Sequence, residues 1–247
     1  MTDPLLALVD LPGVRAAAES ARDALAEVHR HRANRRGWPT TAAEAAVRAA
    51  RASAAIEGAD ITLPEDGRVI EPVLAGSLRV GQAMDGAALG NTVRTWERAP
   101  LQTLARLHLL AATDIAGADE LGRPRTAPDV GERLNLLGQV VVQSRAPAPV
   151  VAAVVHGELL ALAPFGTADG IVARAASRLV AVASGLDPHN LGVPEVSWLR
   201  RRDDYLAAAQ GFATGAPDAV GAWLTLCCAG LEAGAREATS IADAAQG

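Results

Sequence analysis

Lysine is absent from this chain of 247 residues, and all 23 basic side chains are arginines. Together with 28 acidic residues they give a formal net charge of −5. A protein that binds nucleic acid through bulk electrostatics needs the opposite sign, so we expect no nucleic-acid partner. The sequence also lacks a signal peptide and an uninterrupted apolar run of about 20 residues, the length that spans a bilayer. We therefore predict a cytoplasmic protein without a membrane association.

Cysteine and aromatic residues are scarce as well. The two cysteines, Cys227 and Cys228, are adjacent on an expected helix, where they make a poor disulfide pair and lack metal-ligand spacing. We therefore predict no metal site. Half of the residues are apolar, alanine dominates among them, and aromatic residues make up only 3%. Small side chains favour closely packed helices, and strand patterns are weak throughout. The predicted fold class is all-α.

The first half of the chain is expected to consist of helices separated by polar breaks. Thr40 or Thr41 is the expected N-cap of one helix, because Glu44 lies three residues beyond Thr41 in a capping-box pattern. Gly58 is the expected end of that helix. The other expected elements are a helix over 12–33, a break over 35–41, a mixed segment with room for a short helix over 59–90, one or two helices over 92–113, and a polar loop with room for a short hairpin over 117–132.

The second half contains a helix, a short loop of small residues and another helix. Pro147 and Pro149 open the first helix, and Gly185 closes the second. A loop of small residues that leads into a helix N-terminus is a common way to hold a phosphate. The expected elements are a helix over 150–162, a loop over 163–170, a helix over 171–184, and two closing helices over 195–214 and 216–239.

The stretch APFGTADGIVAR, residues 163–174, resembles the motif His-Pro-Phe-x-(Asp/Glu)-Gly-Asn-Gly-Arg-x-x-Arg of the Fic (Fido) family, the fold of protein adenylyltransferases, or AMPylators. The two align without a gap, and the resemblance extends over most of residues 40–235. It implies a helical Fic-type domain with a possible short hairpin flap. It also implies a ligand or phosphate pocket formed by Pro164, Phe165, Gly166, Thr167, Ala168, Asp169, Gly170 and Arg174.

A second stretch, SAAIEG at 53–58, resembles the inhibitory motif (Ser/Thr)-x-x-x-Glu-(Gly/Asn) of the same family. The resemblance implies that Glu57 pairs with Arg174 and blocks productive ATP binding, with Ser53 and Gly58 completing the motif. Independently of the family, Ser53 and Glu57 are four residues apart and share a helix face. The alternative is a surface glutamate before a glycine stop. We predict an N-terminal helical segment over 1–62 that carries this motif, followed by a Fic-like core with the closing helices.

That core, 63–247, departs from the family motif at the positions that carry chemistry. Ala163 replaces the histidine that the resemblance implies is the general base, and alanine cannot move a proton. Thr167 replaces the acidic residue implied to hold Mg²⁺, and Ile171 replaces an arginine. The catalytic residue is therefore unknown, and the cofactor is unknown with ATP and Mg²⁺ disfavoured. His156 is the nearby alternative base, or a buried core histidine.

Asp169 replaces the family asparagine at the mouth of the helix over 171–184. Its carboxylate can cap the free N–H groups of that helix and repel a phosphate. Other polar candidates have two interpretations each. Glu158 faces the pocket or pairs with an arginine, Arg123 and Arg125 reach an anionic ligand or are solvated, His108 packs between helices, and 200–202 is a solvated, self-paired face.

These observations favour a degenerate Fic-fold protein with a regulatory or binding role. The alternative is a repurposed or slow nucleotide-using transferase that acts in the same pocket, with His156 as its base in the slow case. If the chain is an enzyme, it transfers a nucleotidyl or another group. The resemblance implies a protein partner or target and is compatible with a homodimer.

Overall fold

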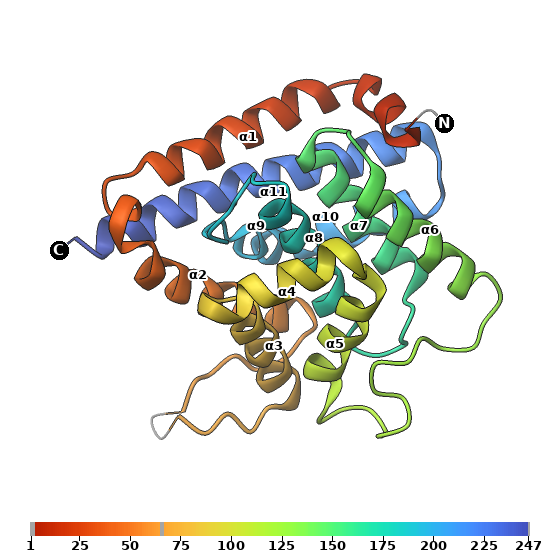
Figure 1. Ribbon diagram of the computed structural model, residues 1–247, viewed down its shortest axis with the longest axis horizontal. Coiled ribbons are helices and arrows are strands. Elements are labelled where there is room, and N and C mark those ends of the chain that lie inside the picture. Colours follow the sequence, from red (N-terminus) through yellow and green to blue (C-terminus); the bar gives the residue numbers. More distant parts are fainter. Residues whose placement is uncertain (1–2, 65–66, 247) are drawn as a thin grey trace.

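The structure is a computed structural model that describes residues 3–64 and 67–246, and within these ranges it contains helices and no strand. Figure 1 shows their arrangement. This confirms the predicted all-α fold class. In chain order the elements are η1 (Pro4–Asp10), α1 (Val14–Arg30), α2 (Asn34–Ile56), α3 (Pro72–Ala83), α4 (Gly86–Arg98), α5 (Pro100–Ala112), α6 (Val130–Gln143), α7 (Ala148–Leu162), α8 (Asp169–Ala183), α9 (Pro194–Arg200), α10 (Arg202–Ala213) and α11 (Pro217–Ala244).

Helices α1 and α11 lie side by side and run in the same direction across the top of the view in Figure 1. The Ser20 hydroxyl donates to Glu232, and His31 contacts Asp243. Both pairs are 212 residues apart, which defines the parallel register. Toward α11, α1 presents an apolar stripe with alternating spacings of four and three residues. The stripe consists of Val14, Ala18, Ala21, Leu25 and Val28.

Helix α8 runs through the middle of the molecule and packs against α7, α4, α5 and α2. All of its residues from Gly170 to Val182 are buried. A helix that is buried on every side is normally apolar throughout. Nevertheless, α8 carries Arg174 and Arg178, one turn apart. The helices around α8 must therefore supply partners for two buried guanidinium groups, and this requirement positions the site.

The start of α2 differs from the prediction. The helix begins at Asn34 and continues through Pro39, so 35–41 is not a break and Thr41 is not an N-cap. The Thr41 hydroxyl instead donates to the buried Asn34 side chain at 2.7 Å, and the Trp38 ring stacks on His189 at 4.1 Å. These tertiary contacts hold the first turns in place although Pro39 lacks an N–H for the helix ladder.

Several other boundaries shift because packing, which the local pattern does not contain, determines them. The mixed segment 59–90 holds α3 and the start of α4, and the segment 92–113 splits into two helices at Pro100. The segment 195–214 also splits near Arg201, so that α9 packs on α2 and α11 while α10 packs on α11 and α7. Residues 117–129 form turns without the hairpin that the sequence allowed.

The boundary expected between residues 62 and 63 falls in the irregular segment between α2 and α3. Helices α1 and α2 pack against α11, and α2 also packs against α8, so the N-terminal segment shares its core with the rest of the chain. Among the described residues, no helix combines the length and the apolar character needed to cross a bilayer.

The contact between α3 and α5 depends on Gly76. A Cβ atom on Gly76 would lie 2.0 Å from the backbone oxygen of Ala111, which cannot move without displacing α5. We predict that Gly76→Ala lowers the free energy of unfolding by about 2 kcal/mol or more. The control is Gly90→Ala in α4, where the nearest atom is the end of the Arg94 side chain at 3.6 Å. There alanine should raise stability by about 0.5–1 kcal/mol. Equal responses in urea unfolding would contradict the close approach.

Candidate functional site

Arg174 is held by two elements that lie far from it in the sequence. Its Nη2 lies 2.6 Å from Glu57 Oε1 and also donates to the Ser53 carbonyl, while its Nε donates to Ser53 Oγ at 2.8 Å. Its Nη1 donates to the Tyr205 hydroxyl at 3.3 Å. The ion pair predicted between Glu57 and Arg174 is therefore formed. Ser53 and Glu57 reach the same guanidinium group because their spacing places them on one face at the end of α2.

The two members of this ion pair differ in exposure. The Arg174 side chain is 1% exposed, whereas that of Glu57 is 35% exposed at the C-cap of α2. Gly58 follows with φ of +90°, the left-handed conformation expected of a glycine stop. A Cβ atom on Gly170 would lie 2.2 Å from Glu57 Oε1, so only glycine leaves room for this carboxylate against the first turn of α8.

The loop between α7 and α8 is held by Arg125 from the segment before α6. Its Nε and Nη2 donate to the carbonyls of Ala163 and Leu162, each at 2.8 Å, and its backbone N–H donates to Pro164. Ala163 itself has φ of +42° and ends α7 in the left-handed region. Arg125 thus satisfies carbonyls at the C-terminus of α7, a role that cations commonly take at helix ends.

Asp169 folds back onto the loop that precedes it. Its carboxylate accepts the backbone N–H of Phe165 at 2.9 Å and that of Gly166 at 2.7 Å. Helix α8 begins at Asp169 and not at 171, so Asp169 is inside the helix and not in front of it. Its carboxylate therefore does not cap the helix, as the sequence suggested, but binds amides of the preceding loop. Burial raises the pKa of Asp169 to about 6, and the nearby Glu57 adds to this, although the two amide hydrogen bonds oppose it.

Thr167 is engaged by a buried histidine. His108 accepts the Gly122 N–H at Nδ1, so its Nε2 carries the proton and donates to Thr167 Oγ1 at 3.0 Å. Its ring stacks on Phe165 at 4.2 Å, and burial lowers the pKa of His108. The Thr167 hydroxyl therefore does not cap α8; it joins α5 to the loop.

His156 lies behind Arg174, away from solvent. It is fully buried, and its Nε2 lies 2.8 Å from the Tyr205 hydroxyl, which bridges it to Arg174. Burial and the charge of Arg174 hold the pKa of His156 well below its usual value. Burial also raises the pKa of Tyr205 to about 12, so the phenol stays neutral. The imidazole supports the guanidinium from inside the core and does not face a ligand.

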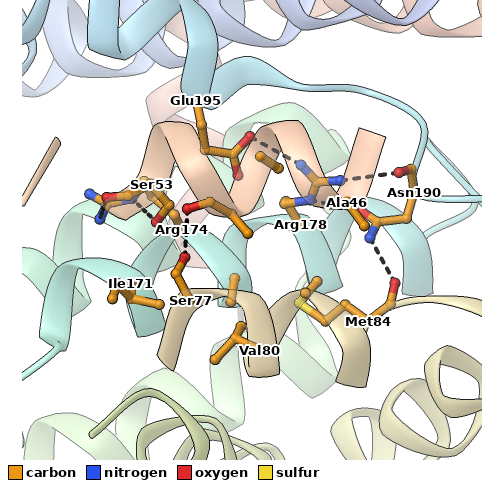
Figure 2. Close-up of a pocket in the computed structure, with 14 residues that line it drawn as sticks. Ala46, Ser53, Ser77, Val80, Met84, Ile171, Arg174, Arg178, Asn190 and Glu195 are labelled. Atoms are coloured by element: carbon orange, nitrogen blue, oxygen red, sulfur yellow. Dashed lines mark hydrogen bonds and ion pairs between the residues drawn. The ribbon is translucent and has the colours of Figure 1, made fainter. Parts of the chain in front are cut away.

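A second buried arginine lies one turn further along α8, and the sequence analysis missed it. Arg178 donates to Asn190 and pairs with the buried Glu195 at 3.0 Å, and the Asn190 amide donates to Met84 O (Figure 2). A cavity of about 30 Å³ separates this group from Ser53 and Arg174. It has room for water but not for a nucleotide. The spacing of four residues from Arg174 on an apolar helix was the available signal.

The remaining candidates have local partners or none. Glu158 pairs with Arg133 at 2.8 Å. In 200–202 only Arg201 shows the expected pairing, with Asp204 at the surface, whereas Arg202 donates to the Ile56 carbonyl at the end of α2 at 2.7 Å. Both cysteines are buried as free thiols. In the ranges 3–64 and 67–246, no group of three or more histidine, cysteine or acidic side chains is arranged to hold a metal ion.

Comparisons with known proteins place the fold. The crystal structure of a Fic family protein from Desulfovibrio desulfuricans G20 superposes with a TM-score of 0.69 and 18% identity, covering 91% of this chain and 74% of the other. The chain therefore has the Fic fold that the two motifs predicted. Comparisons with protein-family models and with curated protein sequences give no match.

Because Arg174 is buried and Arg133 is not, removing the acidic partner of Arg174 should cost more stability than removing that of Arg133. Glu57→Ala leaves the buried Arg174 without its anion and should lower the free energy of unfolding by about 1–3 kcal/mol, less than for a fully buried pair because Glu57 is partly exposed. The control is Glu158→Ala, which breaks the more exposed pair with Arg133 and should cost less than about 1 kcal/mol. Similar losses in chemical denaturation would show that Arg174 does not depend on Glu57.

The raised pKa of Asp169 predicts a pH-dependent difference between the wild type and Asp169→Asn. A carboxyl whose folded-state pKa lies near 6, above the usual 3.8, binds its proton more tightly in the folded state. The wild type should therefore gain stability relative to the variant as the pH falls from about 8 to about 5, by about 1–2 kcal/mol. Other titrating groups cancel in this difference. A difference that stays constant over this range would refute the raised pKa.

Proposed function

We propose that this Fic-fold chain is related to protein adenylyltransferases but does not transfer AMP, and that it acts in a regulatory or binding role through a partner protein. The observation that carries the proposal is Ala163, which stands where the family resemblance implies a histidine base. Arg125 donates to the backbone carbonyl of Ala163. The methyl side chain of Ala163 has no proton to exchange, so it cannot act as a general base.

The ion pair between Glu57 and Arg174 supports the proposal. Arg174 makes four hydrogen bonds with Ser53, Glu57 and Tyr205, so only one of the five guanidinium N–H groups remains available. The resemblance implies that pairing of this arginine with the glutamate blocks productive ATP binding. Here the guanidinium is committed to the end of α2, as expected for a chain kept in an inhibited arrangement.

The residues present do not fit ATP with Mg²⁺. A magnesium ion prefers carboxylate ligands, but Thr167 offers a hydroxyl that already accepts a hydrogen bond from His108. The Asp169 carboxylate is engaged by two backbone amides, and Ile171 replaces the first motif arginine.

One observation favours a second candidate, a repurposed group transferase in the same pocket. With a pKa of about 6, Asp169 exchanges its proton close to neutral pH, as a general base requires. A thermal-shift screen with nucleotides and small anionic metabolites tests this candidate, because a ligand at 100 times its Kd stabilises the folded state by about 2.7 kcal/mol.

Labelled ATP tests the absence of AMP transfer. The wild type and Glu57→Gly, each incubated with Mg²⁺, should both remain unlabelled because no base is positioned at residue 163. Label in Glu57→Gly alone would contradict the proposal and indicate a slow adenylyltransferase that uses another base. Asp169→Asn in the Glu57→Gly background would then test whether Asp169 is that base, because His156 is fully buried behind Tyr205. The combination of Glu57→Gly with Ala163→His shows whether the histidine is the missing component.

A further inference from the structure

We propose that the chain closes its own anion site with two carboxylates, so that removal of Glu57 alone leaves the loop over 163–170 unable to bind an external oxyanion. The second carboxylate is that of Asp169. This inference rests on the proposed function, because it concerns the regulation of the same site, but it is tested without any transfer reaction.

The carboxylate of Asp169 occupies the position that an anion would take. The N–H groups of Phe165 and Gly166 converge on its two oxygens, one on each. Backbone amides that converge in a turn form a concave anion site, and the N-terminus of α8 adds the positive end of its dipole. Because the carboxylate belongs to the first residue of α8, it is present at a fixed and very high effective concentration.

The loop cannot readily turn its amides elsewhere. His108 holds Thr167 through a hydrogen bond and stacks on Phe165, while Arg125 binds the carbonyls of Ala163 and Leu162. These contacts come from α5 and from the segment before α6. They preorganise the amides around the carboxylate of Asp169.

Glu57 lies against the same helix end. Its Oε1 lies so close to Gly170 that a Cβ there would be 2.2 Å away, and the negative charge of Glu57 acts on Asp169. An external oxyanion would therefore meet two like charges and would find Arg174 already bound. Removing Glu57 takes one partner from Arg174, which keeps Ser53 and Tyr205, and leaves Asp169 on the amides. Opening the site requires both changes.

Sulfate is a suitable probe because its charge is constant around neutral pH. Its binding should be measured at about pH 8, where Asp169 is ionised, by calorimetry and by the amide shift of Gly166 in ¹⁵N-labelled protein. Four proteins are compared: the wild type, Glu57→Gly, Asp169→Asn and the double variant. The matched control is Asp129→Asn, which makes the same change just before α6.

The proposal predicts that the wild type, Glu57→Gly and Asp129→Asn bind sulfate weakly or not at all. The double variant should bind at least about 10-fold more tightly than Glu57→Gly, since the second like charge, that of Asp169, has also been removed. The sulfate affinity of Asp169→Asn alone should fall between those of Glu57→Gly and the double variant. Sulfate should move the Gly166 amide resonance in Asp169→Asn and in the double variant. If asparagine keeps the loop closed through its own oxygen, Asp169→Ser provides the same comparison with a shorter side chain.

Two results would overturn the proposal. One is sulfate affinity in Glu57→Gly equal to that of the double variant. The other is absence of sulfate binding in a folded double variant and in its Asp169→Ser counterpart. Neither depends on AMP transfer. A double variant that binds sulfate and also labels with ATP would overturn the proposed function while leaving the two-carboxylate closure intact.

Discussion

The buried guanidinium group of Arg174 is the constraint on which the site depends. A permanent charge that is 1% exposed must be satisfied from all sides, and here α2 supplies Ser53 and Glu57 while α10 supplies Tyr205. These three partners come from opposite ends of the sequence. The same contacts that stabilise the charge therefore fix the end of α2 against the first turn of α8, and Gly170 is the residue that makes this approach sterically possible.

The polar side chains in and around the loop form a consistent set of contacts. Asp169 satisfies the amides of Phe165 and Gly166, Thr167 satisfies His108, and Arg125 satisfies the carbonyls at the end of α7. Each of these polar groups is therefore paired within the chain, next to the N-terminus of α8, where the helix dipole favours negative charge.

The sequence predicted the ion pair of Glu57 with Arg174 because both residues lie in recognisable motifs with local spacing. It could not predict the pair of Arg178 with Glu195, because no local pattern shows that Glu195, in the first turn of α9, and Asn190, in the segment before α9, approach α8. The start of α2 was misplaced for a similar reason. Pro39 signals a break locally, but a buried hydrogen bond between Thr41 and Asn34 outweighs this signal. Local patterns identify elements, and long-range contacts determine where they end.

The parallel pairing of α1 with α11 has a consequence for synthesis of the chain. The apolar stripe of α1 is synthesised about 200 residues before α11, the helix that covers it. The stripe must remain uncovered, or transiently covered by a chaperone, until α11 has emerged from the ribosome. A product that ends before α11 would therefore expose an unpaired hydrophobic helix.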